Sequence, residues 1–555
     1  MFKPNEDKSA MIWQKSKEHS PINVCSYFSV TRIIKKIPET LNDEVEIRTY
    51  DGIHERFFRI DMNDISDINV VTARCHRNYL IFSQYFKSLI HDTIIEQVRN
   101  ADIHEIVSYE NTCLGWRTID DKKVFLYDET TLPNGKISKC TRSVSAFKRG
   151  SEDEYDKLLS EHVYTSTPLS IAYVLSFCGV IASRLKDICD LGVLLVGLSG
   201  TTTSGKTTAL QLMSSVWGDA RDNSSFLNRN NASEIGFYAQ FAGMYGPCIC
   251  FDDINTNKKM DMSAFIYNIC KGLGRIVAKT TGAVDDSREG YDGIAITTTE
   301  TPLLECVDKL QGLEVRILDL NNVRWTSSSE QAEHIKEVIY NHSGFKGIKF
   351  ARFIETLSDI DLKNRYDEAL GEVRNLQVKT DSLSKRISKK FAVILATARL
   401  LNELFGDKLD CDAIVKFIIN LEQSLVDERD PARYTYEYFK GLFLNNVKTF
   451  NIKKDEIKVS NSQVATPNGV AWYKSNLQEL HVYIGIDKAK VLLNQIGYTQ
   501  IENYRSEWKK RGFTKCDSEK TYSSSSTVYS GRHYHFVYPN IILTNVYIGD
   551  EIYEQ

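Results

Sequence analysis

Apolar positions follow different periods in successive parts of this 555-residue chain, and each period predicts a different kind of element. Before residue 150, short alternating runs are separated by turn signals, of which Asp51-Gly52 is the clearest. A separate stretch has the apolar spacing of a helix. These patterns predict strands 46–50 and 55–60, strands 115–117 and 123–127, and a helix over 78–98. Region 1–155 is therefore expected to be a mixed α+β domain.

The pattern then changes to continuous apolar runs alternating with helical stretches, over region 156–344. Such runs are typical of parallel strands buried on both faces. The longest apolar run, 169–182, is too short to span a bilayer, so it predicts a buried helix before the first strand. We expect a soluble, cytoplasmic protein with no membrane partner.

The last two regions differ from each other. Region 345–431 has helical spacing almost throughout, and Pro431 closes a charged run that marks its end. Region 432–555 has two short helical stretches followed by a tight turn and alternating β-rich segments. That order predicts a winged helix, a domain that binds DNA or docks on protein.

Composition narrows the classes of partner and site. A net charge of −4 gives no basic field over the whole protein, so nucleic acid must be bound by local patches. The twelve cysteines include no C-x-x-C pair, which indicates reduced thiols rather than a zinc site. Several histidines, His54, His76, His91 and His104 among them, stand alone in the sequence, and His533 and His535 alternate on a strand without cysteine partners. We assign none of these to a metal.

One stretch carries a specific chemical motif, G-x-x-x-x-G-K-[ST], between a predicted strand and a predicted helix. Two glycines let the backbone curve around a phosphate, and the helix N-terminus adds partial positive charge. Lys206 is expected to reach the β- and γ-phosphates of ATP, and the Thr207 hydroxyl to hold Mg²⁺. The expected nucleotide-binding residues are Gly200, Thr201, Thr202, Thr203, Ser204, Gly205, Lys206, Thr207 and Thr208.

A second apolar strand, 247–251, delivers Asp252 and Asp253 at its C-terminal end. By itself this could be a strand that ends in an acidic turn. Its position after the phosphate loop favours a Walker B pair, in which Asp252 holds Mg²⁺ and Asp253 orients or deprotonates the attacking water. Glu is more usual at the second position, so Asp253 has a shorter reach.

These motifs, with Val216-Trp217-Gly218 and Glu314-Val315-Arg316, resemble the family called domain of unknown function 927. Within it, the chain is similar to the MCM-like AAA+ replicative helicases of staphylococcal cassette and pathogenicity-island elements. The resemblance implies an α/β fold: an AAA+ P-loop ATPase core with a helical lid, a mixed α+β N-terminal domain and a C-terminal winged helix. It also implies a ring, expected to be a hexamer of identical subunits, with ATP bound between them.

The resemblance further implies roles for single residues. Thr298, with Thr299 as second choice, corresponds to a sensor that contacts the γ-phosphate or the attacking water. Arg316 corresponds to an arginine finger acting on the neighbouring subunit, or it only pairs with Glu314 or Asp319. In the lid, Arg386 is the first choice for a second sensor, acting in cis or in trans, and Arg399 is the runner-up.

Two basic groups are candidate DNA contacts. Arg275 and Lys279 lie on a predicted hairpin that either grips DNA in a central pore or is only solvated. Lys509, Lys510 and Arg511 cluster at the end of the second C-terminal helix, where they contact phosphates or form the solvated edge of a docking domain.

The leading hypothesis is an ATP-dependent DNA helicase that replicates a mobile element, with single-stranded or forked DNA in a central pore. A primase, polymerase or initiator protein is a candidate partner. The alternative is an AAA+ initiator or switch that assembles on DNA without unwinding it. A phosphotransferase with the same loop is a third hypothesis, and Arg316 and the winged helix count against it.

Overall fold

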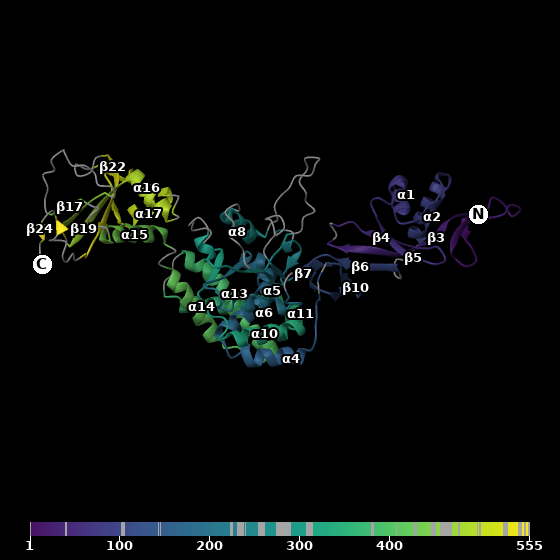
Figure 1. The fold of residues 1–555 in the computed structure, drawn as a ribbon, viewed down its shortest axis with the longest axis horizontal. Helices are drawn as coiled ribbons and strands as arrows, with labels where there is room; N and C mark the ends of the chain where they lie inside the picture. Colours follow the sequence, from purple (N-terminus) through teal and green to yellow (C-terminus); the bar gives the residue numbers. More distant parts are fainter. Residues whose placement is uncertain are drawn as a thin grey trace.

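The architecture was read from a computed structural model. It describes residues 2–555 except for 39–40, 101–105, 143, 145, 222–225, 230–237, 239, 253–260, 273–289, 307–314, 379–381, 407, 427–429, 446–450, 455–468, 475–477, 497, 499–500, 526–530, 542–546, 549–550 and 553–555. In Figure 1 the N-terminal and C-terminal sheets lie on either side of a central unit, and the two ends of the chain lie far apart.

Among the described residues, the N-terminal sheet has eight strands, and the long strand β3 is its centre. Strands β4 and β5 pair antiparallel with Tyr50 opposite Glu55, which confirms the predicted hairpin. Helices α1 and α2 contribute to an apolar core with β2 to β5. The strands are β1 (Phe2–Pro4), β2 (Ala10–Trp13), β3 (Ile22–Ile37), β4 (Glu44–Tyr50), β5 (Glu55–Asp61), β6 (Val107–Asn111), β9 (Glu129–Thr131) and β10 (Ile137–Cys140).

The predicted helix over 78–98 is wrong in its first half. Helix α1 (Ile68–Arg77), capped by the Asp67 side chain, ends before that range. Tyr79 then adopts a left-handed backbone (φ 65°), which no helix tolerates. The chain turns again at the 3₁₀ helix η1 (Gln84–Phe86), and α2 (Lys87–Asn100) follows. Apolar spacing alone did not reveal this break.

The central unit is built on a parallel five-stranded sheet in the order β12-β14-β15-β11-β16. The described residues of β11, β14 and β15 are almost all buried, as continuous apolar runs predict. Helix α6 packs against β14 and β15, and α8 packs against β11. The elements are β11 (Leu194–Ser199), α6 (Lys206–Ser215), β12 (Leu227–Arg229), β14 (Ile249–Asp252), α8 (Met262–Lys271), β15 (Ile294–Thr298), η3 (Leu303–Glu305), β16 (Ile317–Asn321) and α10 (Ser329–Asn341).

The strand pair β7 (Leu114–Ile119) and β8 (Lys122–Leu126) confirms the second predicted pair, and it packs into the central unit. Strand β13 (Met244–Tyr245) pairs with β7. Trp116 Nε1 donates to the carbonyl oxygen of Val180 at 2.9 Å, and the Phe125 ring stacks on Trp217. The hydrophobic core of the central unit therefore extends into the chain before residue 150.

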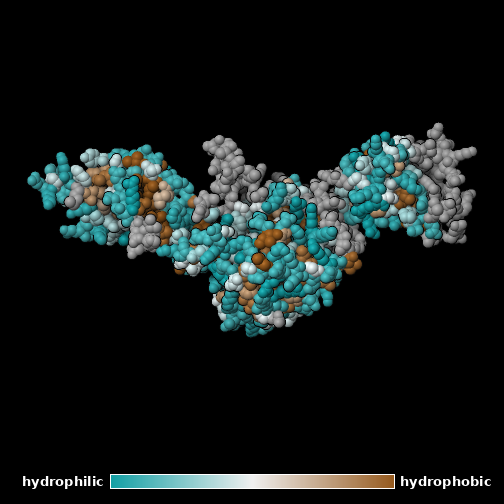
Figure 2. Space-filling model, turned by 180° about the vertical axis from the view of Figure 1, so that it is seen from behind, coloured by the Kyte–Doolittle hydropathy of each residue, from teal (hydrophilic) through white to brown (hydrophobic). Residues whose placement is uncertain are grey.

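Helix α5 (Thr167–Cys189) lies at the centre of this core, where the sequence predicts a buried helix. Within the described part of the chain, it is the one helix long and apolar enough to cross a membrane, and 89% of that window is buried inside the protein. The face of the molecule in Figure 2 is mainly hydrophilic, with scattered apolar areas. Helix α5 is therefore a core helix.

The predicted helical region is helical, and it shares the same core. Helix α13 packs along α5 and against α12 and α14. A helical turn of π type, η2, links α4 to α5. These elements are α4 (Glu152–Leu158), η2 (Leu159–Val163), α11 (Lys346–Thr356), α12 (Asp359–Leu376), α13 (Ser382–Phe405) and α14 (Cys411–Val426).

The C-terminal unit has its own core around Trp508, formed by three helices and a sheet. Along the chain, helix α15 precedes β19, then α16, α17, β20 and β22 follow, and β22 lies between β19 and β20. Strands β17 and β18 extend the sheet beyond β19. The elements are α15 (Pro431–Asn445), β17 (Asn451–Lys454), β18 (Val470–Lys474), β19 (Glu479–Gly485), α16 (Ile486–Gln495), α17 (Ile501–Lys510), β20 (Thr514–Lys515), β21 (Ser524–Ser525), β22 (Arg532–Tyr538), β23 (Tyr547–Ile548) and β24 (Glu551–Ile552).

Candidate nucleotide site and opposite basic pocket

The carboxyl ends of the parallel strands meet at one edge of the central sheet, where they border a cavity of about 760 Å³. Ligands of open parallel sheets bind at this edge because the connecting loops and helix N-termini converge there. The cavity is lined by Thr202, Thr203, Ser204, Gly205, Lys206, Thr207, Thr208, Asp252, Thr298, Thr299, Glu300, Arg324, Thr326, Ser328, Ser329, Ala332, Glu333 and Lys336. Gly200 and Thr201 line a smaller pocket on the other side of the same loop.

The loop between β11 and α6 depends on its two glycines. Gly200 has φ 129° and Gly205 has φ 85°, both in the region that side chains disfavour. A Cβ atom on Gly205 would lie 2.5 Å from Oγ1 of Thr326. Helix α6 begins directly after Gly205, so its N-terminal N–H groups border the cavity. The loop therefore has the backbone and the electrostatics of an anion cradle.

Lys206 lies on the inner curve of this loop. Its Nζ donates hydrogen bonds to the carbonyl oxygens of Gly200 at 2.6 Å and Thr201 at 2.8 Å. The ammonium is thereby held within the cavity wall at the base of α6, where a phosphate group would meet a point positive charge. The predicted lysine thus occupies the position that the motif requires.

Three oxygen-bearing side chains from three elements meet beside Lys206. Thr207 Oγ1 on α6 donates to Oδ1 of Asp252 at 3.2 Å, and Thr298 Oγ1 on β15 donates to the same atom at 2.7 Å. Hydroxyl and carboxylate oxygens are the hard donors that Mg²⁺ accepts, with water completing its octahedron. The donor set fits a magnesium ion held by Thr207 and Asp252. Thr298, rather than Thr299, makes the contact with Asp252.

Other predicted residues lie outside the described part of the chain. They are Asp253, Arg275, Lys279 and Glu314. Their roles therefore stay predictions.

Sequence reasoning missed the far wall of the cavity, formed by the loop after β16 and the start of α10. Arg324 is held there by hydrogen bonds from its guanidinium to the carbonyl oxygens of Thr326 and Ser327. Lys336 lies one helical turn after Glu333 and pairs with it at 3.0 Å. No short motif marks these two cations, and only the return of the chain to the phosphate loop brings them there.

Arg316 lies in the turn just before β16, at the opposite edge of the sheet from the phosphate loop. Its guanidinium carbon lies 4.6 Å from the centre of the Tyr267 ring. The Asp319 carboxylate accepts hydrogen bonds from Ser199 and from the Leu304 N–H. These are the described hydrogen bonds of Asp319, and Glu314, the other candidate partner of Arg316, lies outside the described residues.

Arg386, from α13, lies in the same place as Arg316. Both line a pocket of about 290 Å³, separate from the phosphate-loop cavity, together with Lys271, Lys389 and Lys390. Lys389 Nζ donates to the carbonyl oxygen of Cys189 at 3.1 Å, which ties α13 to the end of α5. The runner-up, Arg399, instead pairs with Glu372 on α12. The structure therefore joins the two predicted arginines into one basic pocket.

The basic cluster of the C-terminal unit makes many contacts within its own chain. Lys509 Nζ donates to backbone carbonyl oxygens of Ser518, Glu519 and Thr521. Arg511 pairs with Asp430 and Glu507. Lys510 is exposed and lies 3.5 Å from Glu507. Lys510 has a far more exposed side chain than Arg511, at 77% against 34%.

Asp319 lies midway along β16, between the two edges. It is buried against Gly197, whose added Cβ would lie 2.7 Å from its carboxylate. Burial raises the pKa of Asp319 to about 6, against the opposing effect of its hydrogen bonds from the Leu304 N–H and Ser199. A titrating carboxyl is thus built into the centre of the sheet.

Comparisons with known proteins agree with this geometry. Residues 82–289 match the family described as "Domain of unknown function (DUF927)". A solved structure titled "SCCmec type IV Cch - active helicase" matches with a TM-score of 0.76 over 97% of both chains, at 18% identity. At that identity the match establishes a shared fold.

Two further comparisons add little. The A-form apo structure of the NrS-1 C-terminal region covers 69% of this chain and 89% of its own, at 11% identity. Its TM-score of 0.23 supports no argument. No curated protein matches the chain.

Proposed function

We propose that this protein is an ATP-dependent DNA helicase, a ring-forming AAA+ motor of the MCM-like kind that replicates a mobile element. The observation that carries the proposal is the convergence of Lys206, Thr207, Asp252 and Thr298 at the carboxyl edge of a parallel sheet. The sheet order, with the phosphate-loop strand β11 between β15 and β16, supports the AAA+ part of the proposal. The shared fold with a helicase of a cassette element supports the choice of motor.

In this proposal ATP lies along the glycine loop with its triphosphate at the N-terminus of α6. Lys206 neutralises the β- and γ-phosphates, and Thr207 and Asp252 hold Mg²⁺, which supplies charge neutralisation at the γ-phosphate. Thr298 fixes the Asp252 carboxylate and is positioned to sense the γ-phosphate or the attacking water. Asp253, directly after Asp252, orients or deprotonates that water. Arg324 and Lys336 line the far wall as further cations in cis.

Arg316 and Arg386 act on a neighbouring subunit in this proposal. Both line the pocket at the amino edge of the sheet, so neither reaches the phosphate loop of its own subunit. A head-to-tail contact between identical subunits brings that edge against the next subunit's loop, and repetition closes a ring. Arginine supplied in trans stabilises the charge of the transferring phosphoryl group. The shared pocket favours the trans role for Arg386 over the cis role.

The C-terminal unit supports the DNA-directed part of the proposal. The order α15, β19, α16, α17, β20, β22, with β22 central among the three strands, supports the proposal of a winged helix, here extended by β17 and β18. Lys510 is its candidate phosphate contact, while Lys509 and Arg511 stabilise the domain. Arg275 and Lys279 remain the candidate pore contacts.

The test is ATP-dependent displacement of a forked DNA duplex by the full chain. We expect displacement that is lost in Lys206→Ala and in the absence of Mg²⁺. DNA-stimulated ATPase without displacement on any fork favours the alternative, an AAA+ initiator or switch that does not unwind DNA. An ATPase rate per subunit that does not change with protein concentration contradicts both the helicase and the initiator hypothesis, because each needs an assembled ring.

A further inference from the structure

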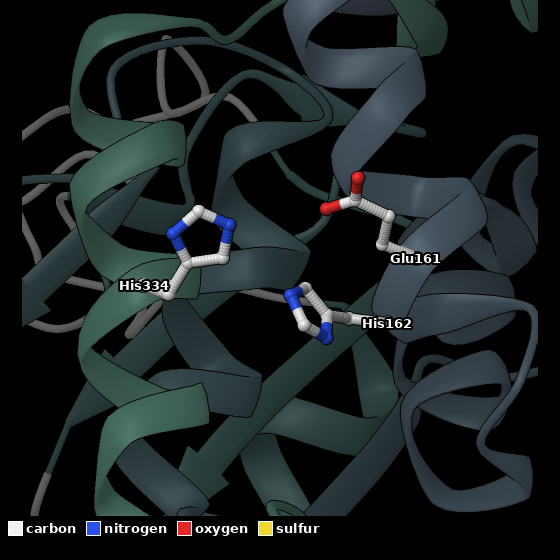
Figure 3. Close-up of side chains that lie close together, drawn as sticks. All are labelled: Glu161, His162 and His334. Carbon is white, nitrogen blue, oxygen red and sulfur yellow. The ribbon is translucent and has the colours of Figure 1, made fainter.

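Outside the nucleotide site, three potential metal ligands converge between the π-type turn η2 and helix α10. They are Glu161 and His162 on the turn and His334 on the helix, and their ligand atoms all lie within 4.8 Å of one another. Figure 3 shows the Glu161 carboxylate and the two imidazole rings directed toward a common point. The rings of His162 and His334 lie 5.2 Å apart, edge to face.

The local backbone explains why two consecutive residues face the same helix. The Tyr164 N–H donates to the Leu159 carbonyl oxygen at 2.9 Å, five residues back, which is the bond of a π-turn. A π-turn holds more residues than an α-turn, so neighbouring side chains diverge by a smaller angle. Such turns inside helical segments are frequently found at functional sites.

One face of helix α10 lies against the π-type turn η2. Gln331 and His334 are three residues apart and therefore lie on one face of the helix. Gln331 Nε2 lies 3.4 Å from Nδ1 of His162, so this face of α10 contacts the His162 ring.

We propose that Glu161, His162 and His334 bind a divalent transition-metal ion of the zinc class. Two imidazoles and one carboxylate are a common ligand set for such ions, with water in the fourth position. Tetrahedral ligands about 2.0 Å from zinc lie roughly 3.3 Å apart, so ligand atoms within 4.8 Å of one another need to approach by at most about 1.5 Å. Glu161 and His334 are exposed, and their side chains can make that movement.

The proposed metal site connects the turn η2 with helix α10, and both belong to the central unit. Ala332, Glu333 and Lys336, on another face of α10, line the phosphate-loop cavity. A bound ion fixes α10 against the turn that leads into the core helix α5. We therefore expect the ion to raise the thermal stability of the unit that carries the nucleotide cavity.

The test is titration of the reduced, metal-stripped full chain with Co²⁺ and then Zn²⁺. Histidine and carboxylate ligands give Co²⁺ visible bands without the intense thiolate charge-transfer band, which separates this site from the twelve cysteines. We expect one Co²⁺ per chain, displaced by Zn²⁺, and a higher Tm with Zn²⁺. His334→Ala and His162→Ala each weaken binding at least about tenfold and abolish the rise in Tm.

Two further variants keep the outcome interpretable. Glu161→Gln preserves shape and hydrogen bonding and is expected to weaken Zn²⁺ binding with no change in far-ultraviolet circular dichroism. His54→Ala removes an exposed histidine of the N-terminal sheet and is expected to bind as wild type does. A thiolate band at one equivalent, absent binding, or unchanged affinity in His334→Ala overturns the proposal.

Discussion

The carboxyl edge and the amino edge of the central parallel sheet carry different sets of charged residues. At the carboxyl edge, Lys206, Thr207, Asp252 and Thr298 line the cavity in which we propose that a triphosphate and a magnesium ion bind. At the amino edge, Arg316 and Arg386 line a basic pocket and lack such a cradle. From Arg316 to the end of β16 is five residues, or about 16 Å at the rise of a strand. No side chain spans that distance, so the comparison points to a site completed by a second subunit.

The largest expected effect is at the amino edge. Arg316→Ala should lower kcat for ATP hydrolysis about 10³-fold, because a trans arginine stabilises the transferring phosphoryl group. Its affinity for a non-hydrolysable ATP analogue should stay within about threefold of wild type, since the residue is far from its own phosphate loop. Steady-state ATPase and equilibrium binding measure the two quantities.

Arg365→Ala is a matched control for this variant, because it removes an arginine that pairs with Glu403 on the helical surface. It should leave kcat unchanged. Loss of nucleotide binding in Arg316→Ala would contradict the separation of the two edges.

The next effect is at the carboxyl edge. Thr298→Val removes the hydroxyl that donates to Asp252 at 2.7 Å and leaves the side-chain volume almost unchanged. We expect kcat to fall roughly 10- to 100-fold, because Asp252 loses the group that orients it. Thr298→Ser, which keeps the hydroxyl, should recover most of that activity. Equal loss in both variants would assign Thr298 a packing role only.

A smaller effect is expected for the second arginine of the basic pocket. Arg386→Ala should lower kcat about tenfold, since Arg316 stays in place to stabilise the γ-phosphate. Arg399→Ala is the comparison, because Arg399 pairs with Glu372 instead of lining the pocket. ATPase rates at saturating protein concentration measure both. A larger loss in Arg399→Ala than in Arg386→Ala would reverse the assignment.

The last prediction concerns how Asp319, midway along β16, changes the free energy of unfolding with pH. The pKa of Asp319 is raised from 3.8 to about 6, so the native state binds more protons than the unfolded chain in that window. The contribution of Asp319 to the free energy of unfolding is therefore lost as the pH rises from about 4 to above about 6. The shift corresponds to about 3 kcal/mol. Asp319→Asn should gain about that much free energy of unfolding relative to wild type between pH 4 and pH 7.

Urea denaturation of the central unit at several pH values measures this difference. Asp412→Asn, at an exposed position on α14, is the control and should follow wild type at every pH. A difference between Asp319→Asn and wild type that does not change with pH would show that Asp319 titrates normally.

The contrast between the edges also explains what the sequence could predict. The phosphate loop is local: its glycines, Lys206 and Thr207 are consecutive, so a motif is enough. Asp252 was predicted because it ends an apolar strand, and Thr298 was predicted from the family resemblance. The pocket of Arg316 and Arg386 is formed by residues 70 positions apart on different elements, and only packing of α13 on α5 brings them together.

Charge patterns in the sequence were less informative than motifs. Lys509, Lys510 and Arg511 are alike in the sequence, yet backbone carbonyls and carboxylates of the same domain bind two of them. The break at Tyr79 and the packing of β7 and β8 into the central unit also depend on tertiary contacts that no local period encodes.

The most direct test of a shared site is to mix two inactive variants. Lys206→Ala lacks the phosphate lysine, and Arg316→Ala lacks the arginine at the other edge. If the arginine acts in trans, a mixed ring has interfaces that combine an intact Lys206 with an intact Arg316. An equal mixture should then recover up to about a quarter of wild-type ATPase activity, the fraction of head-to-tail contacts in which both are intact. No recovery in rings that demonstrably contain both variants would contradict the account.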